Sequence, residues 1–394
     1  MKDALERIFR AGVEACRAER VLAPHLPASP PGRTIVLAIG KAAVAMARVA
    51  ETALPGRLTG LAVVPHGTAG GLERVELIHA GHPVPDAGSV EAAQRLLALA
   101  GEAGEEDLVL VLLSGGASAL ACLPGDGLDL AEKRRVTEAL LRSGTAIGEI
   151  NNVRRHLSRI KGGRLALAAA PARLLTLAIS DVAGDRPENI GSGPTVADPT
   201  TIADAKAVLA RHGIAGPAAG WSETPKALTS DYRILARPAD AIAAAAAEAT
   251  RLGYRPVLLG ECDGEARELG RAHAGLALKA AKGTALISGG ELVVRVTGDG
   301  SGGRNREYAL AAALKMDGRA DIHGLAADTD GIDGAGPAAG AFFDGTTLAR
   351  SARNAAETLA ANDSGGFFDA LGDSFVTGPT GTNVNDLRII LIAP

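Results

Sequence analysis

The stretch TIVLAIGKAAVAMARVAETAL, residues 34–54, decides the fold. Its apolar run before Gly40 predicts a buried strand, Gly40 and Lys41 predict a tight turn, and the periodicity of the following residues predicts a helix. The same pattern recurs in DLVLVLLSGGASAL at 107–120 and begins again with RLLTLAIS at 173–180. Uninterrupted Val, Ile and Leu strands are typical of a parallel sheet covered on both faces. We therefore predict an α/β fold with a Rossmann-like parallel-sheet domain.

The length of the chain and a change in its pattern predict two domains. A chain of 394 residues is about twice as long as a common single domain. The segment 213–230 contains Pro217 and Pro225 but no long periodic run, so a linker or crossing segment is expected there. We predict a Rossmann-like domain over residues 1–235 and a smaller mixed α/β domain over 236–394. The expected elements of the second domain are helices 238–252, 264–281, 304–315 and 346–361, strand 254–259, and the strands ALIS, ELVVRVTG, IHGLAAD and LRIILIA.

The composition excludes several classes of protein. Charged residues make up 22% of the chain and no long apolar run occurs, so neither disorder nor a membrane span is expected. A net charge of −4 and an aromatic content of 3% leave little to bind nucleic acid. The first residues lack the apolar stretch of a secretory signal, and Cys16, Cys122 and Cys262 stand far apart. We expect a cytoplasmic protein without disulfides, and with no nucleic-acid or membrane partner.

Four glycine-rich turns are candidates for binding phosphate. Such turns expose backbone N–H groups at the ends of strands and the beginnings of helices, where anions are favoured. One turn alone is a weak signal, because glycine is common in turns for steric reasons, but four favour a phosphate-bearing ligand. The turns are Gly40-Lys41, Ser114-Gly115-Gly116-Ala117-Ser118, Ser288-Gly289-Gly290-Glu291 and Gly298-Asp299-Gly300-Ser301-Gly302-Gly303-Arg304.

The last of these turns matches the dinucleotide pattern GxGxxG through Gly298, Gly300 and Gly303, between a predicted strand and a predicted helix. Two features argue against a nicotinamide cofactor. Arg304 follows at once, and Asp321 precedes the next strand instead of ending it, where a ribose-binding carboxylate belongs. A Walker A motif is absent from the sequence, which excludes an ATP site of the P-loop type.

Phosphoryl transfer requires cations near the transferred group, and Lys41 and Arg304 are the candidates. Lys41 follows the first strand at the start of a helix, where its ammonium could reach a phosphate or a carboxylate. A solvated lysine is the alternative, but the helix dipole disfavours an idle cation at that position. Arg304 also stands at a helix start, where a guanidinium suits a bidentate contact, unless it is an ordinary surface arginine.

Two acidic loops could contribute to a magnesium site. They contain Asp181 and Asp185 in SDVAGD, and Asp330 with its neighbours in DTDGIDG. Mg²⁺ takes one or two carboxylates together with phosphate oxygens and water, although Asp and Gly also dominate ordinary turns. The second loop lacks the Glu at the end of an EF-hand, so calcium is not expected.

A basic segment and a stiff loop are further candidates. Arg154, Arg155, Arg159 and Lys161 form a basic helical face that could attract an acid or a nucleotide phosphate, unless it is simply a solvated surface. His82 stands between prolines in GHPVPD, where it could be held at a cleft or belong to a structural turn.

Taken in order, the motifs resemble those of the class II glycerate kinase family, whose second half is the MOFRL domain. The resemblance extends from about Ala38 to Leu391 and has one departure, Arg306, where the family pattern GGRNQE has Gln. The matching motifs are AIGKAA, GHPVPD, LLSGGASAL, NNVRRHLSRIKGGRLA, SDVAGDRPENIGSGPTVADPT, ISGGE, GGRNRE, DTDGIDG and TGTNVNDL.

The resemblance implies a D-glycerate 2-kinase that uses Mg²⁺-ATP as donor and forms 2-phosphoglycerate, with an active site between the two domains. It implies Lys41 and Arg304 as the catalytic pair, and Asp181, Asp185 and Asp330 as candidate metal ligands. Glycerate and ATP would be its partners, and a homodimer is left open. The residues then expected to bind substrate or ATP are Gly40, Ser114, Gly115, Gly116, Ala117, Ser118, Arg155, Asp181, Gly184, Asn189, Gly289, Gly290, Glu291 and Asn305.

Two other functions stay open at this point. Similar chains have been labelled hydroxypyruvate reductases, and a reductase would need a nicotinamide fingerprint and an acid such as a histidine paired with a carboxylate. A module that binds a sugar acid or a nucleotide without catalysis is the other alternative.

Overall fold

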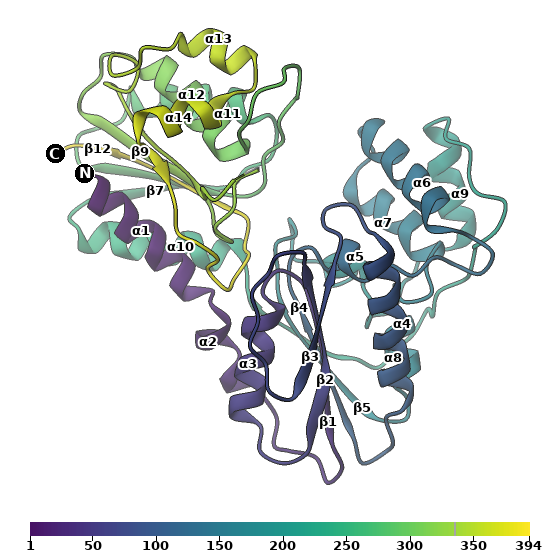
Figure 1. The fold of residues 1–394 in the computed structure, drawn as a ribbon. Coiled ribbons are helices and arrows are strands. Elements are labelled where there is room, and N and C mark those ends of the chain that lie inside the picture. Colours follow the sequence, from purple (N-terminus) through teal and green to yellow (C-terminus); the bar gives the residue numbers. More distant parts are fainter. Residues whose placement is uncertain (335) are drawn as a thin grey trace. The chain divides into compact units, whose positions relative to one another are not determined.

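The computed structural model describes residues 1–334 and 336–394, which form two compact units (Figure 1). One unit consists of Val21–Leu235, and the other combines Met1–Arg20 with Ala236–Pro394. The predicted first domain, residues 1–235, therefore differs from the structure at its start, because residues 1–20 belong to the unit that contains the C-terminal half.

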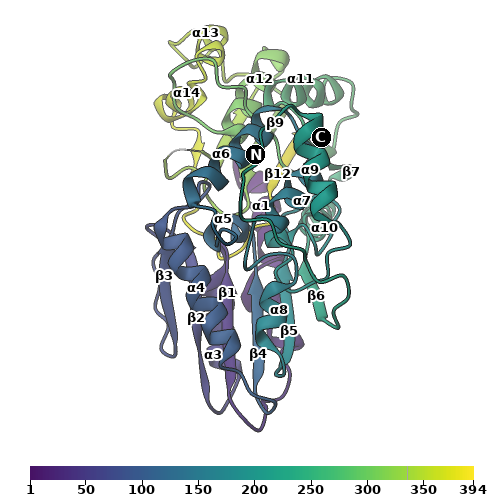
Figure 2. The ribbon, with the colours of Figure 1, turned by 90° about the vertical axis from the view of Figure 1, so that its right-hand side faces the viewer.

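The Val21–Leu235 unit is built on a six-stranded sheet in the order β3-β2-β1-β4-β5-β6, which Figure 2 shows from left to right. The pairs β1–β2, β2–β3, β1–β4 and β4–β5 are parallel, in agreement with the predicted Rossmann-like sheet. Its strands are β1 (Thr34–Ile39), β2 (Leu58–Pro65), β3 (Val75–Ala80), β4 (Leu108–Leu113), β5 (Arg173–Ile179) and β6 (Asp231–Ala236).

Helices cover both faces of this sheet, with α3 on one side and α4 and α8 on the other in Figure 1. Ile35, Leu37 and Ile39 of β1 pack toward α4 and α8, while the alternate residues of this buried strand face the other side. The helices of the unit are η1 (Ala23–His25), α3 (Ala43–Ala53), α4 (Ala87–Gly101), α5 (Ala117–Leu120), α6 (Leu130–Arg142), α7 (Ile147–His156), α8 (Arg164–Ala169), η2 (Ile190–Ser192) and α9 (Ile202–Arg211).

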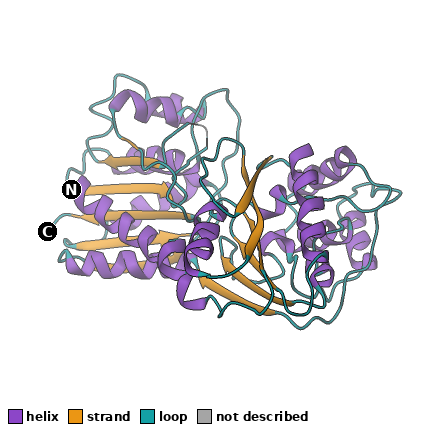
Figure 3. Cartoon of the chain, turned by 60° about the horizontal axis from the view of Figure 1, so that its bottom comes forward, coloured by secondary structure: helices purple, strands orange, loops and turns teal. Residues whose placement is uncertain are grey.

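The other unit is built on a mixed sheet in the order β11-β10-β9-β12-β8-β7. Only β7 and β8 pair in parallel, and the remaining described pairs are antiparallel. This agrees with the predicted mixed α/β domain, and Figure 3 distinguishes the strands from the helices that cover them. The strands are β7 (Arg255–Glu261), β8 (Thr284–Gly289), β9 (Ile322–Asp328), β10 (Gly340–Asp344), β11 (Ser374–Phe375) and β12 (Asp386–Ile392).

Helices cover both faces of the mixed sheet. Alternate residues of β12 separate the two cores, since Leu387, Ile389 and Leu391 face α1 and α10, whereas Ile390 and Ile392 face α11 and α12. The helices are α1 (Lys2–Ala15), α10 (Pro238–Arg251), α11 (Ala266–Ala277), α12 (Arg304–Met316), α13 (Ala355–Ala360) and α14 (Ser364–Leu371), and α2 (Ala18–Val21) follows α1.

The first helix packs on the mixed sheet because its apolar stripe is buried there. Leu5, Ile8, Phe9 and Val13 recur at helical spacing and join the core of α10 and β12. The ring of Phe9 lies edge-on to that of Phe375, with centroids 5.3 Å apart. Each such side chain contributes about 1.5–3 kcal/mol when it is buried. The stripe is visible in the sequence, but the sheet that receives it is not.

Two predicted elements of this unit differ from the structure. ELVVRVTG, residues 291–298, forms no strand, because the backbone at its end bonds to another segment: the amides of Thr297 and Gly298 donate to Asn362 Oδ1 at 2.7 and 3.0 Å. The helix expected at 346–361 is limited to α13, since Asn354 caps it through the amides of Ala356 and Glu357. Within the described ranges, no helix is long and apolar enough to cross a membrane.

Candidate active site

The turns after β1 and β4 meet at the point where the strand order of the Rossmann-like sheet reverses. In open α/β sheets, ligands bind in the crevice that forms there. The Lys41 amide donates to the Gly115 carbonyl at 2.9 Å, and the Ala42 amide donates to Ser114 Oγ at 3.0 Å. Gly40 has a φ of +131°, and a Cβ at this position would lie 2.2 Å from Ser114 Oγ. Only glycine allows this close approach of the two predicted turns.

The second turn continues into a polar network that joins it to the loop after β5. Ser118 Oγ lies 2.7 Å from Ser192 Oγ, which donates to Asn151 Oδ1 at 3.1 Å. The Asn151 amide group in turn donates to Asn189 Oδ1 at 3.2 Å. At Gly116, φ is +85° and a Cβ would lie 2.9 Å from the His82 ring. The structure thus brings Gly40, Lys41, Ser114–Ser118 and Asn189 to one edge of the sheet.

Lys161 connects the segment around α5 to η2. Its ammonium donates to the carbonyls of Ser118 at 2.9 Å, Ala121 at 3.1 Å and Gly191 at 3.3 Å. These acceptors belong to α5, to the residue after it and to η2. All three N–H donors of the lysine therefore fix backbone, and the side chain is only 2% exposed.

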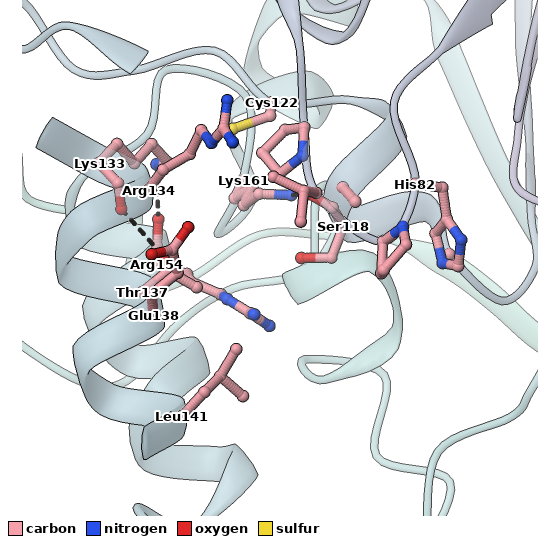
Figure 4. Close-up of a pocket in the computed structure, with 15 residues that line it drawn as sticks. His82, Ser118, Cys122, Lys133, Arg134, Thr137, Glu138, Leu141, Arg154 and Lys161 are labelled. Atoms are coloured by element: carbon pink, nitrogen blue, oxygen red, sulfur yellow. Dashed lines mark hydrogen bonds between the residues drawn. The ribbon is translucent and has the colours of Figure 1, made fainter. Parts of the chain in front are cut away.

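A cavity of about 230 Å³ opens beside this network within the same unit (Figure 4). In Figure 4 the labelled residues of α6, from Lys133 to Leu141, lie on one side, with Ser118 and Lys161 between them and His82. The cavity is lined by His82, Pro83, Val84, Pro85, Gly116, Ser118, Ala119, Cys122, Lys133, Arg134, Thr137, Glu138, Leu141, Arg154 and Lys161.

The cavity carries positive charge that the surrounding protein does not neutralise. Among the residues that the structure describes, Lys133, Arg154 and Lys161 form no ion pair with a carboxylate. Burial, together with the charges of Lys133 and Arg154 and against an opposing effect of Cys122, lowers the pKa of Lys161 to about 7. Burial also lowers the pKa of Lys133 to about 8. A cluster of like charges in a cavity favours the binding of an anion.

Of the predicted binding residues, Arg155 lies elsewhere. It is 3% exposed, pairs with Asp198 at 2.9 Å and donates to the carbonyl of Glu188 at 3.1 Å. Burial opposes ionisation of Asp198, but hydrogen bonds from Thr200 and the charge of Arg155 lower its pKa overall. Its neighbour Arg154 lines the cavity instead. Of the two adjacent arginines, Arg154 therefore lines the cavity and Arg155 lies in an ion pair.

The acidic candidates are not gathered into a metal cage. Asp181, Gly184 and Asp185 lie in the loop that follows β5 at the carboxyl edge of the Rossmann-like sheet. Asp330 lies in the other unit, where its carboxylate accepts from the Ile332 amide at 2.8 Å. Across residues 1–334 and 336–394, no group of three or more His, Cys, Asp or Glu side chains is arranged to hold a metal ion. Such a loop suits Mg²⁺ only in the mode where phosphate and water complete the coordination.

In the other unit Arg304 is surrounded by carboxylates. Its Nε donates to Asp386 at 2.9 Å, its Nη1 to Glu291 at 2.7 Å and its Nη2 to Asp328 at 2.7 Å. Burial by itself lowers the pKa of this guanidinium, but the three carboxylates raise it overall. These bonds use three of the five N–H donors of arginine, which leaves one on each terminal nitrogen.

The other predicted residues of this unit support the same arrangement. The Asn305 side chain donates to Asp386 Oδ1 at 2.7 Å, and Asp333 accepts the first amides of α12 from Asn305 and Arg306. Arg306, the departure from the family pattern, is buried and donates to the carboxylate of Asp333 at 3.2 Å. Gly289 and Gly290 accept from Arg388, which also pairs with Asp386.

The GxGxxG match does not form a dinucleotide fingerprint. No strand precedes it, and its N–H groups bond within the unit: the Gly300 amide donates to the Ala361 carbonyl and the Ser301 amide to Asp363 Oδ1, both at 3.0 Å. Amides engaged in this way are not available to a pyrophosphate. The GxGxxG pattern therefore does not indicate a nicotinamide site in this chain.

Sequence reasoning missed several residues of these clusters. Lys133 and Cys122 gave no signal, because a lysine within a helix and an isolated cysteine are common in any chain. Asp386 was present in the motif TGTNVNDL but was not assigned a role. Its signal was an acid next to a buried strand, in a matched motif.

Two family models cover most of the chain: "Domain of unknown function (DUF4147)" matches residues 4–220, and "MOFRL family" matches residues 284–386. The D-glycerate 2-kinase of Thermotoga maritima is 39% identical, over 100% of this chain and 98% of that protein. The crystal structure of a glycerate kinase from the same organism has a TM-score of 0.88 and 39% identity, and covers 100% of this chain and 99% of that one.

This chain belongs to the class II glycerate kinase family. The family explains why both units are present, since the two family models fall on the two halves of the chain. Two relatives from Agrobacterium vitis carry another name, "Putative hydroxypyruvate reductase"; one of them is 46% identical, over 99% of this chain and 94% of that protein. The relatives thus carry the names of two different activities, a kinase and a reductase, and the chemistry of the site must distinguish between them.

Proposed function

We propose that the chain is a glycerate 2-kinase, which transfers the γ-phosphoryl group of ATP to the 2-hydroxyl of D-glycerate. The observation that carries this proposal is the cationic cavity beside the glycine-rich turns after β1 and β4. Phosphoryl transfer consists mainly of holding two anionic reactants and balancing their charge, and these are the features that such a reaction needs. The full-length similarity to a D-glycerate 2-kinase supports the same reaction.

Two cations are proposed to act on the transferred group. Lys41 stands in the turn after β1, and its ammonium balances negative charge that develops on the phosphoryl oxygens. Arg304 offers the two N–H donors that its carboxylate partners leave, one on each terminal nitrogen, which is the spacing of a bidentate contact. The carboxylates fix the orientation of that guanidinium before the substrate binds.

The surrounding residues position the reactants. The backbone of Gly115, Gly116 and Ala117 and the hydroxyls of Ser114 and Ser118 are proposed to contact the anionic groups of the substrates, together with Gly40 and Asn189. In the other unit, Gly289, Gly290, Glu291 and Asn305 are proposed to hold Arg304 and its ligand. Arg155 pairs with Asp198 and donates to the carbonyl of Glu188, and a contact between Arg155 and the substrate stays a prediction.

Magnesium is proposed as the cofactor that accompanies ATP. Asp181, with Asp185 and Gly184 in the same loop, offers hard oxygen ligands at the carboxyl edge of the sheet, and this donor set fits Mg²⁺. Asp330, whose carboxylate is engaged in a turn of its own loop, is the weaker candidate. When bound, the ion would neutralise charge on the phosphate oxygens.

The reductase has little support from the structure. It would need a nicotinamide fingerprint, and the GxGxxG segment bonds to residues 361–363 instead. His66 is the histidine with the shortest carboxylate contact, 2.6 Å from Asp86, but its side chain is 61% exposed and Asp86 serves as the cap of α4. A hydride-transfer site requires an enclosed acid of this kind.

Two parallel assays decide between these functions. One measures formation of 2-phosphoglycerate from Mg²⁺-ATP and D-glycerate, coupled through enolase without a mutase so that only the 2-phosphate is detected. The other follows oxidation of NADH or NADPH with hydroxypyruvate. A glycerate-dependent enolase signal supports the 2-kinase, while ADP release without that signal indicates another hydroxyl. Nicotinamide oxidation alone would overturn the proposal.

A further inference from the structure

We infer that Arg154 binds the carboxylate of the acceptor acid in the cavity lined by α6 and α7, and so selects acids over neutral alcohols. The inference rests on the proposed function for the identity of the acid, but not for the binding of an acid as such. It assigns the cavity to the acceptor and not to the nucleotide.

Two neighbouring arginines differ in their partners. Arg155 is neutralised by the buried carboxylate of Asp198 at 2.9 Å. Arg154 lines the cavity, and the one hydrogen bond described for it runs from Nη1 to Asn151 Oδ1 at 3.3 Å. Burial disfavours the charge of this guanidinium, since it lowers the pKa. A half-buried guanidinium without a carboxylate partner is a group that an anionic ligand would stabilise.

The two buried lysines of the cavity, Lys161 and Lys133, donate to backbone carbonyls. Lys161 donates to the three carbonyls of Ser118, Ala121 and Gly191. Lys133 donates to the carbonyls of Leu157 and Arg154 at the end of α7. These two lysines contribute positive potential, but Arg154 keeps donors for a direct contact. A guanidinium also matches a carboxylate in a planar, bidentate geometry, which an ammonium does not.

The size and lining of the cavity suit a small acid. Its volume of about 230 Å³ is smaller than the roughly 300–1,000 Å³ of pockets for drug-sized ligands, so it suits a three-carbon acid better than a nucleotide. Pro83, Val84 and Leu141 provide an apolar wall, while Ser118 and Thr137 offer hydroxyls for an alcohol. Glu138 is the one carboxylate of the lining; it is 46% exposed and lies 3.7 Å from Arg142.

The test measures binding of D-glycerate to the full chain by calorimetry, with and without a non-hydrolysable ATP analogue. The variants are Arg154→Met, Arg154→Lys and the control Arg135→Met, an exposed arginine of α6 that pairs with Glu132 and does not line the cavity. We expect Arg154→Met to weaken glycerate binding roughly 10- to 100-fold, Arg154→Lys to weaken it less, and the control to match the wild type. Affinity for the ATP analogue should stay within about twofold of wild type in every variant.

A second readout tests selectivity. Glyceramide has the hydroxyls of glycerate but no charge, so wild type should prefer glycerate strongly and Arg154→Met should lose most of that preference. Unchanged glycerate affinity in Arg154→Met would overturn the inference, and so would a selective loss of affinity for the ATP analogue, because the cavity would then hold a nucleotide phosphate. If wild type binds acids through Arg154 but phosphorylates none, the proposed function fails and this inference stands.

Discussion

Two clusters of cations, one in each unit of this protein, differ in their partners. In the mixed-sheet unit, Arg304 is held by Asp386, Asp328 and Glu291, at distances of 2.7–2.9 Å. In the Rossmann-like unit, Lys133, Arg154 and Lys161 line one cavity, and none of the three pairs with a carboxylate among the residues described. One cluster is neutral or slightly acidic, and the other has a net positive charge.

The difference separates two tasks that a cation can perform. A guanidinium fixed by carboxylates is oriented in advance and requires little rearrangement when a reactive group arrives. A cation without a partner destabilises the empty protein but gains most when an anion binds. We interpret the first arrangement as suited to catalysis and the second to substrate capture. The following predictions test this interpretation, from the largest expected effect to the smallest.

The largest effect is expected on turnover when either proposed catalytic cation is removed. Lys41→Ala and Arg304→Ala should each lower kcat roughly 10²-fold or more, because each removes a charge that stabilises the transition state. The enolase-coupled assay measures this, and Lys282→Ala, an exposed lysine outside both clusters, is the control. Near-normal kcat in both variants would refute the assignment of these two residues.

The second prediction concerns stability and contrasts the two clusters directly. Asp386→Asn should lower the free energy of unfolding by about 3 kcal/mol, because Arg304 and Arg388 both lose a buried partner. Arg154→Met breaks no ion pair and relieves repulsion, so it should change that free energy by less than about 1 kcal/mol. Urea unfolding of the full chain measures both. Equal losses in the two variants would contradict the distinction between the clusters.

The third prediction is a pH dependence of glycerate binding. Burial lowers the pKa of Lys161 to about 7 and that of Lys133 to about 8, so both lose charge as the pH rises from 6 to 9. Since the charged forms attract the acid, affinity should fall by about tenfold over this range, with proton uptake on binding near pH 7.5. The groups that face Lys161 are Lys133, Arg154 and the Cys122 thiol.

Calorimetry in buffers of different ionisation enthalpy detects the proton uptake. Lys161→Arg keeps its charge throughout and should remove the lower of the two inflections. The same burial predicts that the wild-type protein becomes more stable between pH 7 and pH 10, since Lys161 then holds its proton more readily in the unfolded chain. Binding that is independent of pH in the wild type would be inconsistent with a role for these lysines.

The smallest effect is expected from the one carboxylate of the cavity. Glu138→Gln removes a negative charge that faces the bound acid, so glycerate affinity should rise roughly two- to threefold, and less at high salt. Glu132→Gln on the exposed face of α6 is the matched control. A decrease in affinity would show that Glu138 contacts the ligand through hydrogen bonds and would revise the description of the cavity.

Much of the fold could be predicted, because its signals are local. The apolar runs that became β1, β4 and β5 are uninterrupted, and the turns after β1 and β4 contain glycines that their backbone requires, such as Gly40 at φ +131°. The prediction of a strand at ELVVRVTG was wrong because of a contact with a segment distant in the sequence. Its β-branched residues suit a strand, but the amides of Thr297 and Gly298 at its end donate to Asn362 Oδ1.

The candidate site was predicted in part for the same reason. Ser114–Ser118 and Gly289–Glu291 could be named as candidates because a glycine-rich turn is a contiguous pattern. Arg154 and Arg155 could not be told apart, since they are adjacent and chemically identical, and only the position of Asp198 decides which one is neutralised. Lys133 was invisible, because its role depends on the end of α7 and not on its own neighbours in sequence.

By itself, then, the sequence determined the order of strands, turns and helices, the two domain types and the family motifs, since each of these depends on neighbouring residues. The tertiary structure decided which sheet receives α1, which arginine faces the cavity and which cations carry carboxylate partners. The reason is physical. Local backbone preference is set within a few residues, whereas burial and charge neutralisation depend on residues that meet only after the chain has folded.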